Sequence, residues 1–294
     1  MTSTEPTVTV VTPAHNATGW LCECIESIRA QTYEDWEHVI VDDVSTDHTP
    51  DLVRRYSELD PRIKLIQRTE RGGPFVAGND GLRAARGAYF CAIDADDIAP
   101  SERIERQLGF LRSESTLRAC ITPWQSFADG KVIGGVTWLP RQPELLAWYL
   151  LLFATASHSS LFAETDVLRE IGGYRNLPSA QDFRLVSDLS RAGVLGVIPE
   201  VLSLRRRHPA ERGSVYSAFI ESREQAESKS DMELWNAVEI MRDHLRDLAC
   251  VEWSDHDLAQ LWLAGHWKQM ALGPAVSIIN RWLRLAMSDP RPDE

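Results

Sequence analysis

The stretch Ala88-Tyr89-Phe90-Cys91-Ala92-Ile93-Asp94-Ala95-Asp96-Asp97 joins an apolar run to three closely spaced carboxylates. The apolar half has the composition of a buried strand, and the acids follow where that strand would end. Carboxylate oxygens are the ligands that Mg²⁺ and Mn²⁺ prefer, and a bound cation can hold a diphosphate. Because adjacent acids repel one another without a cation, the stretch favours a metal-assisted nucleotide site over a purely structural role.

Short apolar strands alternate with helical segments on both sides of this stretch. The expected strands are Thr7–Thr12, His38–Asp42, Ile63–Gln67 and Ala88–Ile93, and the expected helices are Trp20–Ala30, His48–Leu59 and Val76–Arg86. Strands that alternate with helices are typical of a parallel sheet with crossover helices. The fold class is therefore α/β, and ligands are expected at the carboxyl ends of the strands.

The next hundred residues mix helices with short strands. We expect helices at Pro100–Arg112, Leu145–Phe153, Asp166–Ile171 and Asp182–Ala192, and strands within Ile121–Val136, at Ser160–Phe162 and at Val201–Arg207. Asp129-Gly130 predicts a hairpin turn, and Gly172-Gly173 predicts a helix end. Each of these signals is local.

The composition changes after Gly213, where glycine becomes rare. Long amphipathic helices are expected at Tyr216–Leu248, Asp255–Met270 and Ala275–Met287. The tryptophans that they carry are typical of helix packing, and a partner or acceptor surface is the alternative. We therefore expect an all-helical C-terminal extension over 213–294, which could form a homodimer contact.

The bulk properties exclude several classes of protein. A formal charge of −12 argues against binding to nucleic acid, because that requires clustered Lys and Arg. Five scattered cysteines fit reduced thiols, and no apolar run reaches the roughly 20 residues that a membrane span needs. With no secretory signal at the amino terminus, we expect a cytoplasmic protein, with peripheral membrane contact through its tail as an option.

Three motifs follow the expected strands in order. They are Pro13-Ala14-His15-Asn16, Val41-Asp42-Asp43-Val44-Ser45-Thr46-Asp47 and Ile93-Asp94-Ala95-Asp96-Asp97. Together they resemble the Pro-x-Tyr-Asn, Val-Asp-Asp-Gly-Ser-Thr-Asp and Leu-Asp-x-Asp-Asp motifs of the family 2 glycosyltransferases of GT-A fold. The resemblance covers about Thr7 to His208. It implies an α/β/α sandwich with a mostly parallel sheet in a domain over 1–212, with a nucleotide-binding half over about 7–100 and an acceptor half over about 101–212.

The resemblance also implies the residues of a nucleotide site. Pro13 and His15 match the positions that flank the base, although His15 replaces the usual Tyr. Asp42 and Asp43 match the acids that read the base, and we favour Asp43 because an ionised carboxylate can accept the N–H of uracil. The alternative is that Asp42 and Asp47 cap the turn before the His48 helix.

Two further residues complete the expected nucleotide site. The resemblance assigns Asp94 to the ribose or to a metal-bound water. The family often shows Ala-Arg-Asn where this chain has Ala77-Gly78-Asn79, and Arg71 or Arg68 could replace that missing Arg.

Metal binding and catalysis are implied in the same way. Asp96 and Asp97 match the acids that coordinate Mn²⁺ or Mg²⁺, and His208 matches a further metal ligand, with an ordinary surface histidine as the alternative. Asp182, in Gln181-Asp182-Phe183-Arg184-Leu185, matches the catalytic base of Glu-Asp-x-x-Leu. The chain departs from that motif because Gln181 replaces Glu, and Asp182 could instead be a helix cap.

The acceptor side is less specific. Trp124, Trp138 and His158 lie where the family builds acceptor contacts, and the two tryptophans could equally be packing residues. The expected function is metal-dependent, inverting transfer of a hexosyl or N-acetylhexosaminyl group. The donor would be a nucleoside diphosphate sugar, with UDP favoured, and the acceptor a hydroxyl group of a saccharide, lipid-linked glycan or small natural product. The alternative is a nucleotide-sugar-binding scaffold without transfer activity, which the substitutions His15, Gly78 and Gln181 favour.

Overall fold

A computed structural model of the chain describes residues 5–137, 139–143, 146–147, 149–150, 156–175 and 181–208. The predicted helices after Gly213, most of the helix predicted at Leu145–Phe153, and Trp138 lie outside the described residues. In the part of the chain that is described, no helix is long and apolar enough to cross a membrane.

The described elements follow one another as an α/β chain. In order they are β1 (Val8–Ala14), α1 (Leu21–Arg29), β2 (Trp36–Asp42), α2 (Thr49–Leu59), β3 (Ile63–Gln67), α3 (Gly73–Ala84), β4 (Tyr89–Ala92), α4 (Arg103–Ser113), β5 (Ala119–Ile121), β6 (Trp124–Ala128), β7 (Lys131–Val136), η1 (His158–Ser160), β8 (Phe162–Glu164), α6 (Thr165–Glu170), α7 (Gln181–Arg191), β9 (Leu195–Val197) and β10 (Ser203–Arg206).

Seven strands form the central sheet in the order β3-β2-β1-β4-β8-β5-β9. β1 pairs in parallel with β2 and β4, so that Val10 lies opposite both His38 and Cys91. β8 alone among the sheet's described strands runs antiparallel to its neighbours β4 and β5. The expectation of a mostly parallel sheet is confirmed.

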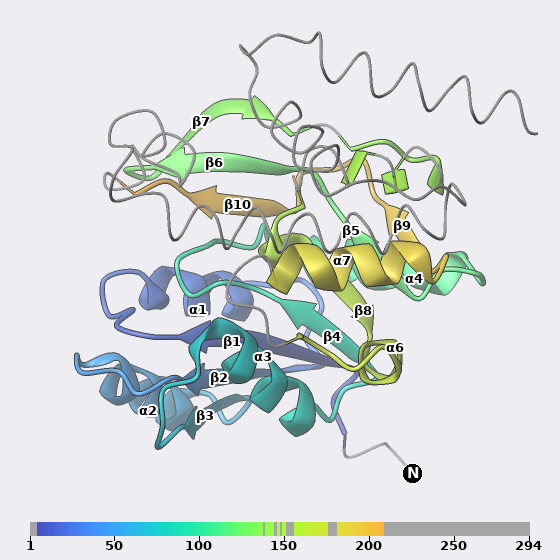
Figure 1. Ribbon diagram of the computed structural model, residues 1–294. Helices are drawn as coiled ribbons and strands as arrows, with labels where there is room; N and C mark the ends of the chain where they lie inside the picture. The colour runs from blue at the N-terminus through green and yellow to red at the C-terminus, as the bar shows by residue number, and fades with distance from the viewer. Residues whose placement is uncertain are drawn as a thin grey trace, which may run out of the picture.

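Helices cover both faces of this sheet. Successive strand residues alternate between two buried clusters, because side chains of a strand point to opposite faces. Val10 and Cys91 pack with residues of α1, α2 and α4, whereas Val11 and Ala92 pack with residues of α3, α6 and α7. Figure 1 shows α3 and α7 on one side of the strands. The predicted α/β/α sandwich is confirmed.

A second, three-stranded sheet lies beside the first, in the order β10-β6-β7 (upper part of Figure 1). Asp129 and Gly130 have φ values of 51° and 70° and join β6 to β7 as predicted, since a two-residue hairpin turn needs positive φ at both positions. An isolated bridge between Ile98 and Leu204 connects β10 to the chain that follows β4. The second sheet is thereby attached next to the acidic stretch.

Three local predictions need correction. α3 begins at Gly73, three residues earlier than predicted, because Pro74 suits the first turn of a helix. Ser160 belongs to the 3₁₀ turn η1 and not to a strand, and the strand itself begins at Phe162. β9 was not predicted, since three residues carry too little periodicity to be recognised.

Glu37 is a buried carboxylate that connects three strands to the chain after α3. Its side chain accepts hydrogen bonds from Thr9 Oγ1 (2.9 Å), Lys64 Nζ (3.1 Å) and Arg86 Nε (2.9 Å). Burial alone would raise the pKa of Glu37, but the bonds from Arg86, Thr9 and Lys64 outweigh it and hold that pKa below its usual value. The ionised form therefore stabilises the fold.

Replacing Glu37 with Gln should lower the free energy of unfolding at pH 7 by about 1.5–3 kcal/mol, the value of hydrogen bonds to a charged group. Because the pKa is lowered in the folded state, the contribution is complete above the unfolded pKa of about 4.3 and is lost as pH falls through the folded value. Urea unfolding at pH 7 and pH 3 should therefore show a smaller difference between variant and wild type at pH 3. Glu58→Gln, at an exposed position of α2, is the control, and an equal difference at both pH values would contradict this role.

Candidate active site

The loops that follow β1 and β2 are held together by hydrogen bonds. The Asp43 N–H donates to the carbonyl oxygen of Ala14 (2.8 Å), and His15 Nδ1 donates to the carbonyl oxygen of Asp43 (2.9 Å). Asn16 Oδ1 accepts from the Thr46 N–H (2.8 Å). Half-buried Pro13 lies in the same strand end, opposite Val41. The structure therefore brings together the residues predicted to surround a base.

Asp42 and Asp43 have different roles in the fold. The two carboxylate oxygens of Asp43 accept the N–H groups of Gly72 (2.9 Å) and Gly73 (2.7 Å), which satisfies unpaired donors at the start of α3. Asp42 Oδ2 accepts from the Ser45 N–H (3.3 Å), and Asp42 Oδ1 is buried with no hydrogen-bond partner among the described residues. Each Asp43 oxygen therefore has a backbone donor, whereas Asp42 Oδ1 has none among the described residues.

The residue between these acids and Ser45 has an unusual backbone. Val44 has a φ of 60°, in the left-handed region that a β-branched side chain rarely adopts. The resembling motif has Gly at this position, where such a φ costs little. Local strain of this kind, of order 1–3 kcal/mol, is typical of functional loops that the surrounding contacts hold in place.

Two basic residues follow β3 near this loop. Arg68 Nη1 lies 3.5 Å from Asp43 Oδ1 and its Nε lies 3.1 Å from Asp80, with 16% of the side chain exposed. Arg71 is exposed. The guanidinium next to the predicted base site is therefore that of Arg68. Asp47 accepts from Thr49 N (3.0 Å) and Thr18 Oγ1 (2.7 Å), so its predicted capping role agrees with the structure.

The three acids after β4 face three different partners. Asp94 Oδ1 lies 2.7 Å from His158 Nδ1, and Asp96 Oδ2 lies 2.7 Å from His208 Nε2. Asp97 accepts hydrogen bonds from Ser159 Oγ (2.5 Å) and from the backbone N–H of Arg206 in β10 (2.9 Å). Each acid therefore connects the loop to a distant segment of the chain.

This arrangement bears on the predicted metal ligands. Within the described ranges, no group of three or more His, Cys, Asp or Glu side chains is arranged to hold a metal ion. Asp96 and His208 are together as predicted and offer one carboxylate and one imidazole. Asp97 differs, because it is 2% exposed and both of its oxygens are engaged. Burial, Asp94 and Asp96 raise the pKa of Asp97 to about 8, although the hydrogen bonds from Ser159 and from the Arg206 N–H oppose the rise.

His158 lies between Asp94 and the aromatic ring of Tyr174. Its Nε2 is 2.7 Å from the Tyr174 hydroxyl. Burial would lower the pKa of His158, but the carboxylate of Asp94 raises it overall, with further contributions from Asp182 and Asp97. For Asp94, burial would raise the pKa, yet His158 and Arg205 lower it overall. The pair therefore favours an imidazolium next to a carboxylate.

Asp182 lies in the first turn of α7, where its Oδ1 accepts the Phe183 N–H (2.8 Å). Burial raises the pKa of Asp182 above its usual value, and Asp94 adds to this, whereas His158 and the Phe183 bond oppose it. A raised pKa makes a carboxylate a better proton acceptor. Asp182 therefore interacts electrostatically with both Asp94 and His158.

Several residues near the acids were not assigned a role by the sequence. The Trp20 ring lies 4.9 Å from that of His208, and Arg206 Nε donates to the Asp96 carbonyl oxygen (2.9 Å). Nothing in the sequence indicates Trp20, because an aromatic residue beside a helix start usually packs. Trp124, predicted for the acceptor, begins β6 with the Arg205 guanidinium 5.4 Å from its ring centroid.

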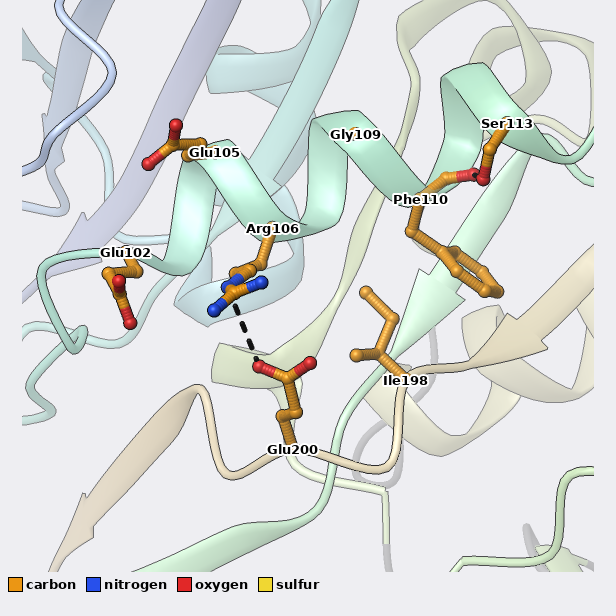
Figure 2. A pocket seen from close by; sticks show the side chains of 8 residues that line it. All are labelled: Glu102, Glu105, Arg106, Gly109, Phe110, Ser113, Ile198 and Glu200. Carbon is orange, nitrogen blue, oxygen red and sulfur yellow. Dashed lines mark hydrogen bonds and ion pairs between the residues drawn. The ribbon is translucent and has the colours of Figure 1, made fainter.

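A separate pocket lies between α4 and the segment that follows β9 (Figure 2). It has a volume of about 540 Å³, and Arg106 Nε reaches across it to Glu200 at 3.7 Å. None of the predicted site residues lines it. Its lining residues are Glu102, Glu105, Arg106, Gly109, Phe110, Ser113, Ile198 and Glu200.

The strand-end loops, the acid loop and Asp182 lie on an α/β/α sandwich with a mostly parallel sheet, the architecture of the GT-A fold. The sequence pattern of the family "Glycosyl transferase family 2" matches residues 9–171, more than half of the chain. An uncharacterized glycosyltransferase of Haemophilus influenzae is 31% identical over 224 residues, which are 72% of this chain and 69% of that protein. The chain belongs to the family 2 glycosyltransferases.

Further similarities support the same family and fold. The putative teichuronic acid biosynthesis glycosyltransferase TuaG of Bacillus subtilis is 37% identical over 115 residues, and the match spans 39% of this chain and 46% of TuaG. S. aureus TarS, crystallised with UDP-GlcNAc, shares the fold with a TM-score of 0.63 at 16% identity, over 95% of this chain and 81% of that one. A Pyrobaculum calidifontis mannosyltransferase, in complex with GDP-Man and Mn²⁺, gives a TM-score of 0.55 at 20% identity. The match covers 97% of this chain and 87% of that one.

Proposed function

We propose that this protein is an inverting, divalent-cation-dependent glycosyltransferase. It transfers one hexosyl or N-acetylhexosaminyl group from a nucleoside diphosphate sugar, with UDP as the nucleotide, to a hydroxyl group of an acceptor. The observation that carries the proposal is the contact between Asp96 of the acid loop and His208, which follows β10. Asp182, whose pKa is raised by burial, supports it through its electrostatic interaction with Asp94 and His158.

The donor would bind at the ends of β1, β2 and β4. Asp42 Oδ1 is the buried acceptor that still needs a donor, and the ring N–H of uracil would supply one. We therefore assign base reading to Asp42 in place of Asp43, the residue favoured by sequence, because Asp43 holds the start of α3. Pro13 and His15 would flank the base, and exposed Asp94 would contact the ribose. Arg68 is better placed than Arg71 to add positive charge.

The carboxylate of Asp96 and the imidazole of His208 form a donor set that fits a divalent cation of the Mn²⁺ or Mg²⁺ type. Asp96 and His208 would hold it, and such ions complete their coordination with substrate phosphates and water. When bound, the ion would neutralise negative charge on the departing diphosphate. The Mn²⁺ in the complex of the structurally similar Pyrobaculum mannosyltransferase supports this assignment.

Asp182 would act as the general base. Its carboxylate accepts the proton of the acceptor hydroxyl while that oxygen forms a bond to the anomeric carbon. The bond from that carbon to the diphosphate oxygen breaks, and the nucleoside diphosphate leaves from the opposite face, so the configuration inverts. The substitution at Gly78 no longer favours the alternative of a nucleotide-sugar-binding scaffold without transfer activity, because a Cβ at this position would lie 3.0 Å from the Tyr174 ring. Close packing thus accounts for Gly78 without a loss of activity.

The donor can be identified first by thermal unfolding with UDP-, GDP- and dTDP-sugars in the presence of Mn²⁺. A ligand that binds only the native state at 100 times its Kd stabilises the fold by about 2.7 kcal/mol. We expect a UDP-sugar to give the largest rise in Tm. No rise with any nucleotide sugar would contradict the proposed function.

Asp182→Asn should leave donor binding intact while stopping transfer. The amide cannot accept the proton, so we expect kcat to fall at least 10²-fold and the Kd for UDP to stay within about twofold of wild type. Nucleoside diphosphate release measures turnover, and calorimetry measures binding. Asp166→Asn, at an exposed position of α6, is the matched control. Equal losses of turnover and UDP affinity would make Asp182 a structural residue.

Asp96→Asn should remove the cation-dependent part of nucleotide binding, because it removes the negative charge of one of the two proposed protein ligands. The rise in Tm that UDP causes should then be the same with Mn²⁺ as with EDTA, whereas in wild type it should be larger with Mn²⁺. Asp129→Asn, in the β6–β7 turn where Asn tolerates positive φ, is the control. A variant that keeps its Mn²⁺-dependent rise would exclude Asp96 as a ligand.

A further inference from the structure

The turn η1 contacts the acid loop through two successive residues. His158 Nδ1 lies 2.7 Å from Asp94 Oδ1, while Ser159 Oγ donates to Asp97 Oδ2 at 2.5 Å. The same Ser159 oxygen accepts the Asp94 N–H at 2.9 Å. One short turn therefore holds both the backbone and the side chain of Asp94.

The other side of His158 is fixed by Tyr174, whose hydroxyl lies 2.7 Å from Nε2. Tyr174 is itself held firmly, because its backbone N–H and carbonyl oxygen bond to the Asn79 side chain at 2.9 and 2.7 Å. Its ring packs on Gly78, where an added Cβ would lie 3.0 Å from the ring. The Tyr174 hydroxyl is thus a rigid anchor that α3 positions.

Exposure differs sharply along this chain of contacts. The side chain of His158 is 11% exposed, whereas that of Asp94 is 45% exposed. One Asp94 oxygen is bonded to the imidazole, and the exposed carboxylate can accept a further bond from a ligand. A carboxylate held in one rotamer loses less side-chain entropy when it binds than a free one.

We propose that His158 and Tyr174 are positioning residues for donor binding, which fix the direction of the Asp94 carboxylate through two successive hydrogen bonds. This assigns His158 to the donor side in place of the acceptor role expected from the sequence. The proposal rests on the proposed function, in which Asp94 contacts the ribose. It predicts that the bonds on the two sides of His158 have separable effects.

Two substitutions of His158 separate these bonds. The amide nitrogen of Asn takes nearly the place of Nδ1, so His158→Asn keeps a donor for Asp94 and loses the bond to Tyr174. The longer Gln places its amide near Nε2, so His158→Gln keeps the bond to Tyr174 and loses the one to Asp94. Tyr174→Phe removes the hydroxyl and retains the ring on Gly78.

Calorimetry with UDP and Mn²⁺ should rank these variants. His158→Gln should weaken binding about 10- to 100-fold, as expected for a lost bond to a charged group. His158→Asn and Tyr174→Phe should each weaken it about 2- to 10-fold, and the double variant should be no weaker than either, because all three lack the same bond. In kinetic assays the donor KM should rise more than kcat falls. His48→Gln, on the exposed histidine before α2, should change nothing.

The inference is overturned if His158→Gln, folded by its melting temperature, binds UDP as wild type does, or if the losses of His158→Asn and Tyr174→Phe add. A crystal structure of His158→Gln without nucleotide provides a test that does not depend on the function. The Asp94 carboxylate should point in a different direction than in wild type, and an unchanged orientation contradicts the inference. If wild type binds no nucleotide but Asp94 turns in this variant, the proposed function fails while the positioning contacts are supported.

Discussion

Repulsion among Asp94, Asp96 and Asp97 is the constraint on which the rest of the site depends. Three carboxylates within four residues cannot all remain ionised and close together without compensation. The fold gives each acid its own partner, namely His158, His208 and the Ser159 hydroxyl. Those partners come from η1 and from the residues at the end of β10, so these contacts also attach the acid loop to segments that follow β7 in the chain.

Asp97 is the acid that the fold buries. Both of its oxygens are bonded inside the fold, and burial beside Asp94 and Asp96 raises its pKa to about 8. Asp94 and Asp96 then remain as the acids available to ligands, each beside an imidazole. One of these imidazoles is anchored to Tyr174, and the other packs edge-on against Trp20. The loop is therefore organised around two carboxylate–imidazole pairs, Asp94–His158 and Asp96–His208.

Much of the first half of the fold could be predicted from the sequence, because its strands are long enough to show periodicity and end in turn or acidic residues. β3 was predicted to the residue, and the turn at Asp129-Gly130 follows from local backbone preference. β9 and η1 could not be predicted, since pairing with β5 and contact with the acid loop determine them. These are tertiary effects that a short segment does not encode by itself.

The site was predictable in its residue types and less so in its contacts. Asp96 and His208 meet as expected, although 112 positions separate them. Asp43 is the acid that the sequence favours for the base, and its carboxylate also accepts the N–H groups of Gly72 and Gly73, which no sequence pattern reveals. Likewise the sequence indicates only that Gly78 replaces an Arg of the family motif. The structure shows that the Tyr174 ring occupies the space beside Gly78. Which polar atoms remain unsatisfied is a property of the whole fold.

A crystal of the protein soaked with UDP and Mn²⁺ would show whether the acid loop binds the donor. We expect an ion at Asp96 and His208 next to the diphosphate, uracil at Asp42, and the Asp182 carboxylate facing the β-phosphate side of the nucleotide. An ion and nucleotide bound elsewhere, or Asp182 turned away from them, would contradict it.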